Sequence, residues 1–180
     1  PLGHEKIKKE NRMEKSLEYT LNNFNPKDID SIFKVYESNE PYFILSGGVP
    51  ATLNTIHENI EEVPPNTDPG FKHYSVVKFH EDIIGIIDYV EMYPDEDAVY
   101  IGLFLIDKPR QGLGHGKRFI RNFEAQMKEK GYHRIRLGVL KNNISGFKFW
   151  ETLGFRFIKE VKSTVKPEKD WTILVMEKKI

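Results

Sequence analysis

The chain has 180 residues and equal numbers of basic and acidic side chains, 27 of each, so it has no overall basic field to attract a nucleic acid. No apolar run approaches the roughly 20 residues that cross a bilayer, and 39% hydrophobic residues are typical of an ordinary globular domain. The absence of cysteine excludes disulfides, thiolate metal sites and a cysteine nucleophile, and the histidines lack metal-ligand spacing. We therefore expect no nucleic acid, no membrane and no metal, and a cytoplasmic location.

The first residues differ in composition from the rest. Residues 1–12 begin Pro-Leu-Gly-His, continue as a charged run and carry no strand or clear helix pattern. We interpret them as a cloning remnant or a loose tail, with Met13 as a candidate natural start. The length of residues 13–180 suits a single domain with a core of its own, and it leaves a homodimer open.

The N-terminal half predicts one strand and two helices. Leu17 to Leu21 is a strand candidate, and Asn25-Pro26 supplies an N-cap and a first-turn proline for a helix. Pro41 and Gly47-Gly48 are expected to break the chain before a second helix, from Pro50 to Glu62. A polar loop rich in proline then leads to the sheet.

The remainder alternates strands with two helices. Strands over 74–79, 83–90 and 100–106 are joined by polar turns and predict an antiparallel meander. A helix with apolar residues at three- and four-residue spacing follows and ends at Gly131. The last predicted elements are a strand at 134–139, a helix at 145–153 and strands at 155–161 and 171–177. The pattern predicts an α/β (α+β) fold, with a mixed, mostly antiparallel sheet and helices on both faces.

The link between the strand at 100–106 and the next helix carries the strongest functional signal. There the run Gln111-Gly112-Leu113-Gly114-His115-Gly116-Lys117 opens the helix. The first four N–H groups of a helix have no partner inside it, the macrodipole adds partial positive charge, and glycines admit an anion closely. The turn therefore predicts a site for a phosphorylated cofactor.

Two familiar phosphate motifs do not fit this turn. A P-loop needs Ser or Thr after Gly-Lys, whereas Arg118 follows Gly116-Lys117. A dinucleotide fingerprint needs a third glycine where Lys117 stands, and an acidic residue about twenty positions further on, where Arg136 to Val139 stands instead. The turn thus predicts neither a nucleoside triphosphate nor a dinucleotide.

A second motif downstream makes the pattern specific. Gln111, Gly114 and Gly116 match Gln/Arg-x-x-Gly-x-Gly/Ala, and Asn143 to Phe155 supplies an Asn, a small residue, an aromatic pair and a Gly-Phe ending. Together the two motifs resemble the GNAT superfamily of acyl-CoA-dependent N-acetyltransferases, from Leu17 to the C terminus. The resemblance implies that residues 13–180 form one N-acetyltransferase domain, a transferase that uses acetyl-CoA.

The resemblance also implies which residues hold the cofactor. In that family the strand before the turn splays from its neighbour, and its free backbone groups hold the pantetheine arm and the thioester, with Ile106 expected nearest the carbonyl. The turn would bind the pyrophosphate, His115 through its backbone only. The cofactor-binding prediction comprises Phe104, Leu105, Ile106, Gln111, Gly112, Leu113, Gly114, His115, Gly116, Lys117, Asn143, Phe149 and Trp150.

Three of these residues also have a purely structural interpretation. Lys117 reaches a phosphate oxygen or is a solvated helix lysine, and Asn143 bonds the pantetheine arm or caps the helix that follows it. Trp150 stands where the family most often has a tyrosine that protonates the leaving thiolate, and an indole N–H is a donor but not a usable acid. Trp150 is therefore expected to contact the cofactor or to pack in the core.

A general base is harder to assign. An alkylammonium has a pKa near 10 and must lose a proton before it attacks a thioester. Many relatives carry a carboxylate on the pantetheine-binding strand, but residues 98–106 contain none. Asp88 and Glu91 on the preceding strand are the nearest candidates by topology, and we predict Asp88 as the base; an ordinary strand-end carboxylate is the alternative.

The acceptor groove of the family is built by the first two helices, the loop between them and the late strands. Tyr42, Phe43 and Tyr93 fall near this region and are the predicted substrate-binding residues. The leading function is an N-acetyltransferase of small-molecule amines. A protein or peptide Nα-acetyltransferase and a non-catalytic acyl-CoA-binding sensor are the alternatives.

Overall fold

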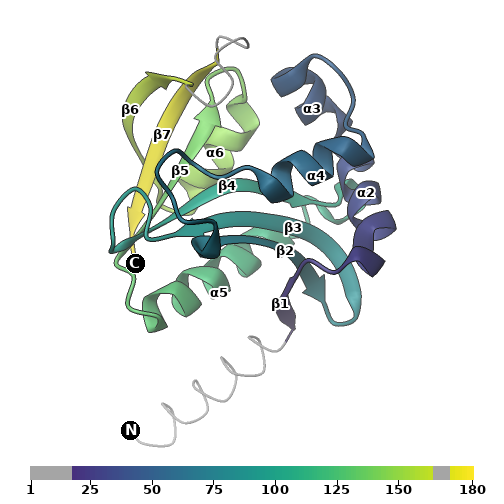
Figure 1. Ribbon diagram of the computed structural model, residues 1–180, viewed down its shortest axis with the longest axis horizontal. Helices are drawn as coiled ribbons and strands as arrows, with labels where there is room; N and C mark the ends of the chain where they lie inside the picture. The colour runs from purple at the N-terminus through teal and green to yellow at the C-terminus, as the bar shows by residue number, and fades with distance from the viewer. Residues whose placement is uncertain (1–17, 164–170) are drawn as a thin grey trace, which may run out of the picture.

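The computed structural model describes residues 18–163 and 171–180. The interpretation of residues 1–12, the start at Met13 and the beginning of the first predicted strand at Leu17 lie outside the described residues. The described ranges form one mixed α/β layer structure around a single sheet (Figure 1).

The sheet has seven strands in the order β1-β2-β3-β4-β5-β7-β6. Every neighbouring pair is antiparallel except β4 and β5, which run parallel. The predicted meander and the late strands are thus confirmed, with shifts of a few residues at their ends. The strands are β1 (Tyr19–Asn23), β2 (Lys72–Phe79), β3 (Asp82–Glu91), β4 (Ala98–Ile106), β5 (Arg134–Leu140), β6 (Arg156–Lys162) and β7 (Thr172–Lys179).

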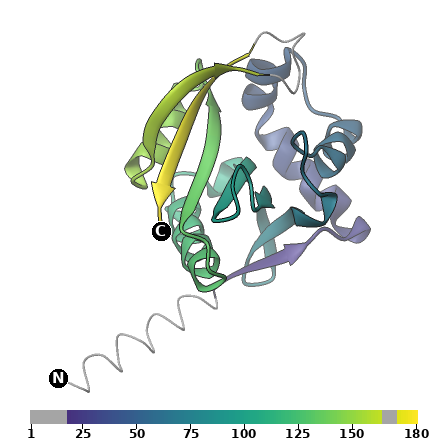
Figure 2. The ribbon, with the colours of Figure 1, turned by 60° about the vertical axis from the view of Figure 1, so that its left-hand side comes forward.

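Helices cover both faces of the sheet, as the sequence predicts (Figures 1 and 2). One core cluster joins the apolar sides of α5 and α6 to the sheet, and a second joins α2, α3 and α4 to the opposite face. The helices are α2 (Ile29–Ser38), α3 (Glu40–Gly47), α4 (Leu53–Glu61), α5 (His115–Glu129) and α6 (Ile144–Thr152). The α5–α6 layer and the α2–α4 layer therefore have separate apolar interiors.

The prediction of a chain break at Pro41 is wrong. Pro41 lies in the first turn of α3, a helix that runs from Glu40 to Gly47 and that the sequence analysis did not predict. Proline is tolerated there because the N–H it lacks would have no partner inside the helix. The chain turns at Asn39, between α2 and α3, and again at Gly48, which ends α3 with a φ of 77°.

Two irregularities at the centre of the sheet position the candidate site. The parallel register between β4 and β5 ends at the pair Ile101 and Leu137, although β4 continues to Ile106, so the two strands diverge from Gly102 onward (Figure 1). At the same level the register of β3 with β4 shifts by one residue, which makes Gly102 the extra residue of a bulge beside Asp88. The splay that the family resemblance implies is present.

Candidate active site

The glycine-rich turn lies at the N terminus of α5, as predicted. Gly112 and Gly114 have φ values of 75° and 85°, a left-handed backbone that glycine adopts without strain. A Cβ built on either of them meets no described atom within 4 Å, so both positions face open space. The turn thus presents the first N–H groups of a fifteen-residue helix to an unobstructed surface.

Gly116 has a different reason to be glycine. A Cβ at this position would lie 3.3 Å from the Phe149 ring and 3.6 Å from Ile106 Cγ1. The first turn of α5 therefore packs directly against α6 and the end of β4. This contact holds the N terminus of α5 next to the part of β4 that is not paired with β5.

A hydrogen-bond network fastens the turn to β4. Gln111 Nε2 donates to the carbonyl of Ile106 at 2.8 Å and to Asn39 Oδ1 at 2.9 Å, and Asn39 Nδ2 donates to the same carbonyl at 3.0 Å. The Ile106 carbonyl therefore anchors the turn, and Gln111 acts on it through its side chain. Asn39, a buried residue that follows α2, was not identified from the sequence because its partner lies 67 positions away.

The side chains of His115 and Lys117 point to different surroundings. His115 is buried and its Nδ1 lies 2.8 Å from the Tyr19 hydroxyl, and burial lowers the pKa of its imidazole. This inward position agrees with a backbone-only role for His115 at the turn. Lys117 is exposed on α5, and the sequence prediction for it stays open.

An aromatic cluster lines the α5 and α6 side of the splay. Phe104 stacks on Phe119 at 5.7 Å between ring centroids and lies 5.9 Å from Trp150 and 6.1 Å from Phe149. Trp150 is buried in the core cluster and meets Phe155 edge-on at 5.1 Å. These contacts favour the packing interpretation of Trp150, whereas Phe149 is only half-buried.

Asn143 takes the capping role that the sequence analysis left open. Its Oδ1 accepts a hydrogen bond from the Gly146 backbone N–H at 3.0 Å, as the N-cap of α6. Its contribution to cofactor binding stays a prediction.

Asp88 lies at the bulge, on the face that carries α2, α3 and α4. Its Oδ2 accepts from Lys72 Nζ at 2.9 Å, and the Asp88 side chain is only 9% exposed. Its Oδ1 is buried without a hydrogen-bond partner among the described residues. Burial raises the pKa of Asp88 to about 6, with Lys72 opposing the rise, so a carboxylate with one free oxygen lies beside Gly102 where β4 leaves β5.

Glu91, the other carboxylate considered, belongs to a different surface. It accepts hydrogen bonds from Lys130 Nζ and from the Tyr132 hydroxyl, next to the end of α5. These partners lower the pKa of Glu91 against the effect of burial. Glu91 is thus an ion-paired structural residue, and Asp88 is the candidate base.

The three predicted substrate residues differ in burial. Phe43 is buried and stacks on Tyr36 at 4.8 Å, so it is a core residue and its assignment to the substrate is corrected. Tyr42 is half-buried, and burial together with the nearby Glu62 raises its pKa to about 12. Tyr93 meets the ring of Tyr100 edge-on at 5.5 Å.

Tyr100 continues this aromatic group to the point where β4 and β5 begin to separate. A Cβ built on Gly138, the first β5 residue beyond the paired register, would lie 2.9 Å from the Tyr100 hydroxyl oxygen. Burial raises the pKa of Tyr100 to about 12, and Tyr93, Arg136 and Tyr42 lie close enough to act on it. The sequence analysis did not single out Tyr100; the available signal was its place two residues before Gly102, a glycine inside a strand pattern.

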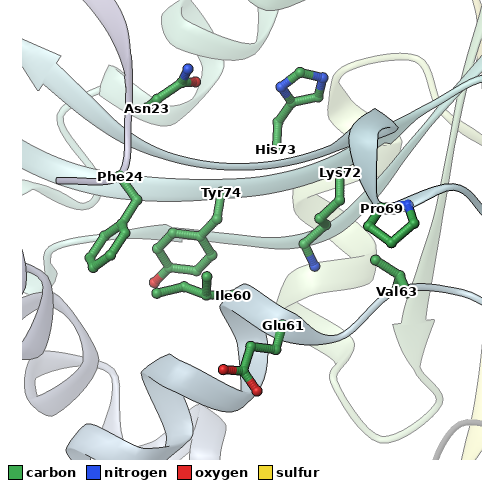
Figure 3. A pocket seen from close by; sticks show the side chains of 9 residues that line it. All are labelled: Asn23, Phe24, Ile60, Glu61, Val63, Pro69, Lys72, His73 and Tyr74. Carbon is green, nitrogen blue, oxygen red and sulfur yellow. The ribbon is translucent and has the colours of Figure 1, made fainter. Parts of the chain in front are cut away.

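A separate open pocket of about 400 Å³ lies where β1 ends beside β2 (Figure 3). In Figure 3 Tyr74 and Lys72 extend from β2 toward α4, which carries Ile60 and Glu61. Lys72 is thus the residue shared by this pocket and the Asp88 pair. The pocket is lined by Asn23, Phe24, Ile60, Glu61, Val63, Pro69, Lys72, His73 and Tyr74.

Within residues 18–163 and 171–180, no group of three His, Asp or Glu side chains is placed to hold a metal ion. No described helix has both the length and the apolar composition to cross a bilayer.

The chain belongs to the acetyltransferase (GNAT) family, whose family model matches residues 32–155. That range contains the meander, the glycine-rich turn, α5 and the Asn143 motif. No curated protein matches this sequence. The family assignment makes the chain an acyltransferase.

Solved structures support the fold over nearly the whole chain. An acetyltransferase from Thermus thermophilus superposes with a TM-score of 0.73 at 22% identity, covering 90% of this chain and 97% of that one. An acetyltransferase from Salmonella typhimurium that modifies the N-terminal serine of a ribosomal subunit protein gives 0.72 at 12% identity, over 90% and 95%. An aminoglycoside acetyltransferase in complex with coenzyme A gives 0.67 at 14% identity, over 89% and 94%. At these identities the likeness shows the fold and leaves the acceptor class to the site itself.

Proposed function

We propose that this chain transfers an acetyl group from acetyl-CoA to a primary amine of a small molecule by direct attack of the amine on the thioester. The single observation that carries the acceptor half of this proposal is Asp88. A buried carboxylate with an unpartnered oxygen lies at the level where β4 and β5 separate. Such an oxygen can accept the proton of an ammonium group, directly or through one water, once the bound amine opens a path to it.

The cofactor half of the proposal rests on the turn and the splay. The N–H groups at the start of α5 would bind the pyrophosphate. The backbone of β4 from Gly102 to Ile106 would hold the pantetheine arm through groups other than the Ile106 carbonyl, which already accepts from Gln111 and Asn39. Acetyl-CoA supplies the activated acetyl thioester. The Phe104 and Phe149 rings line the α5 side of the splay and shield it from water.

Asp88 is the proposed catalytic base. In its ionised form Oδ1 takes the proton that the ammonium must lose, and a pKa of about 6 leaves the carboxylate charged at neutral pH. Trp150 cannot act as an acid, so the proton on the departing sulfur comes from water or from the second proton that the amine nitrogen loses as the amide forms. Tyr42, Tyr93 and Tyr100 would surround the acceptor, since aromatic faces attract cations.

Calorimetric titration with acetyl-CoA, followed by thiol release against a panel of amines in the same preparation, tests the proposal. The panel includes alkyl diamines, aminoglycosides, amino acids and peptides with free N termini. Binding with turnover on small amines supports it. Turnover on peptides alone would replace it by a peptide Nα-acetyltransferase, and binding without turnover on any member would favour a sensor. Absence of acetyl-CoA binding would overturn the cofactor assignment.

A further inference from the structure

Lys72 has an unusual position for a lysine, because its side chain is only 8% exposed. Its Nζ donates to three oxygens: Asp88 Oδ2 at 2.9 Å, the carbonyl of Asn59 at 3.0 Å and the carbonyl of Glu62. Buried ammonium groups are costly unless they are paired in this way. The three donors of the ammonium are all used, so Lys72 is held in one orientation.

Two of these partners belong to the end of α4. Asn59 lies in the last turn of the helix and Glu62 is its C-cap residue. The last carbonyls of a helix lack intrahelical partners and carry partial negative charge, so a cation there is favourable. Lys72 therefore caps α4 with the same ammonium that it offers to Asp88 on β3.

We propose that Lys72 is a positioning residue of this site: its ammonium keeps the Asp88 carboxylate charged, occupies Oδ2 so that Oδ1 is left for the acceptor amine, and fastens α4 to the strand that carries Asp88. The proposal rests on the proposed function in that it takes Asp88 as the base. Lys72 does not itself need to touch the substrate.

The electrostatic surroundings of Asp88 single out Lys72. The groups that face the carboxylate from the packed elements are Lys72 on β2, Glu62 after α4, and the phenols of Tyr36 on α2 and Tyr74 on β2. Burial and Glu62 raise the pKa of Asp88, while Lys72 lowers it. The two phenols stay neutral in the range where Asp88 titrates, so Lys72 is the one cation in this group of residues that favours the charged carboxylate.

The glycine in the bulge makes space for the Asp88 carboxylate beside Lys72. Gly102 leaves room for the carboxylate, since a Cβ there would lie 3.3 Å from Oδ2 and 3.8 Å from Oδ1. The bulge at Gly102 and the Lys72 ammonium thus contact the carboxylate from two different strands. Losing Lys72 would remove the charge partner and leave the carboxylate buried.

The test measures Asp88 itself. The protein is labelled with ¹³C at aspartate carboxyls, the Asp88 signal is assigned by its loss in Asp88→Asn, and its titration midpoint is followed by NMR. Removing an opposite charge at this range raises a carboxyl pKa by about one to three pH units, which is the expected shift in Lys72→Met. Lys72→Arg, which keeps the charge, should titrate near wild type, and Lys128→Met, at an exposed lysine of α5, should not differ from it.

Lys72→Gln keeps a donor for the α4 carbonyls without the charge, and it replaces Lys72→Met if that variant does not fold. Hydrogen exchange at the C-terminal turn of α4 should be faster in Lys72→Met than in Lys72→Gln. An Asp88 midpoint that stays unchanged in the folded uncharged variants would overturn the proposal.

Kinetics with acetyl-CoA and the amine found by the panel separate this inference from the function on which it rests. In the uncharged Lys72 variants the acid limb of kcat/KM should move upward with the NMR midpoint, and in an Asp88→Asn background the Lys72 change should add little. If the NMR titration midpoint of Asp88 shifts but the fall of kcat/KM at low pH does not, Asp88 is not the base. In that case Lys72 still controls the charge of Asp88. A uniform loss of kcat without either shift would reduce Lys72 to a structural residue and overturn the proposal.

Discussion

The proposed cofactor half and the proposed acceptor half of this site are built in different ways. The cofactor half is nearly continuous in sequence: β4, the turn and the start of α5 follow one another between Gly102 and Lys117. The acceptor half joins Lys72, Asp88 and Tyr100 from three strands with the end of α4 and with α3. The cofactor half depends on backbone groups, whereas the acceptor half depends on the contacts of a few side chains. Substitutions should therefore separate cofactor affinity from turnover.

The largest effect is expected from Gly114→Val. A branched side chain at a φ of 85° would be strained and would fill the open space above the turn. Charge-assisted hydrogen bonds are each worth about 1.5–3 kcal/mol, so loss of several of them should abolish acetyl-CoA binding in calorimetry. Gly131→Val is the matched control, because Gly131 also has a positive φ, of 96°, and open space around it, but lies just beyond the C terminus of α5. Unchanged affinity in Gly114→Val would contradict the cofactor site.

Asp88→Asn should affect turnover and leave acetyl-CoA affinity nearly unchanged. Loss of a general base lowers kcat by about 10²–10⁴-fold. Asp88 acts when ionised, so wild-type kcat/KM should fall more steeply as pH drops below about 6, and the variant should lack this extra limb. Asp82→Asn, at an exposed carboxylate on the same strand, is the control. A variant that keeps the wild-type pH profile would remove Asp88 as the base.

Tyr100→Phe tests whether Tyr100 belongs to the acceptor half or to the cofactor half. The change removes the hydroxyl near Gly138 while keeping the ring against Tyr93. If the Tyr100 hydroxyl hydrogen-bonds the acceptor amine, its loss costs about 0.5–1.5 kcal/mol. We therefore expect the KM for the amine to rise by roughly two- to tenfold while the affinity for acetyl-CoA stays constant. Tyr132→Phe, whose hydroxyl donates to Glu91, should leave the amine KM as it is. An effect on acetyl-CoA affinity instead of the amine would assign Tyr100 to the cofactor half.

The smallest effect on activity is expected from Trp150→Phe. The indole packs against Phe104 and Phe155 in the core, so the change should lower thermal stability while kcat stays within about threefold. The comparison with Trp150→Tyr is informative, because a phenol can donate a proton where an indole cannot. A large loss of kcat in a folded Trp150→Phe variant would show that the indole N–H takes part in the reaction.

The accuracy of the sequence predictions follows the same division. The turn and α5 were predicted because glycine spacing, apolar periodicity and the capping Gly131 are local signals, whereas the splay was expected only from the family resemblance. The helix α3 was missed because Pro41 reads as a break unless it falls in a first turn, and nothing local distinguishes the two. Phe43 was assigned to the substrate because an aromatic residue looks the same in a groove and in a core.

The sequence by itself determined the family, the order of the elements apart from α3, and the place of the glycine-rich turn, since these depend on residues a few positions apart. The tertiary structure decided the rest. It pairs Lys72 with Asp88 across two strands, ties Asn39 to the end of β4, and brings Tyr100 beside Gly138. Such contacts arise from strand register and helix packing, and burial then sets the ionisation of the groups involved. An isolated Asp in a sequence has an ordinary pKa, whereas Asp88 acquires its raised one only when the sheet and α4 enclose it.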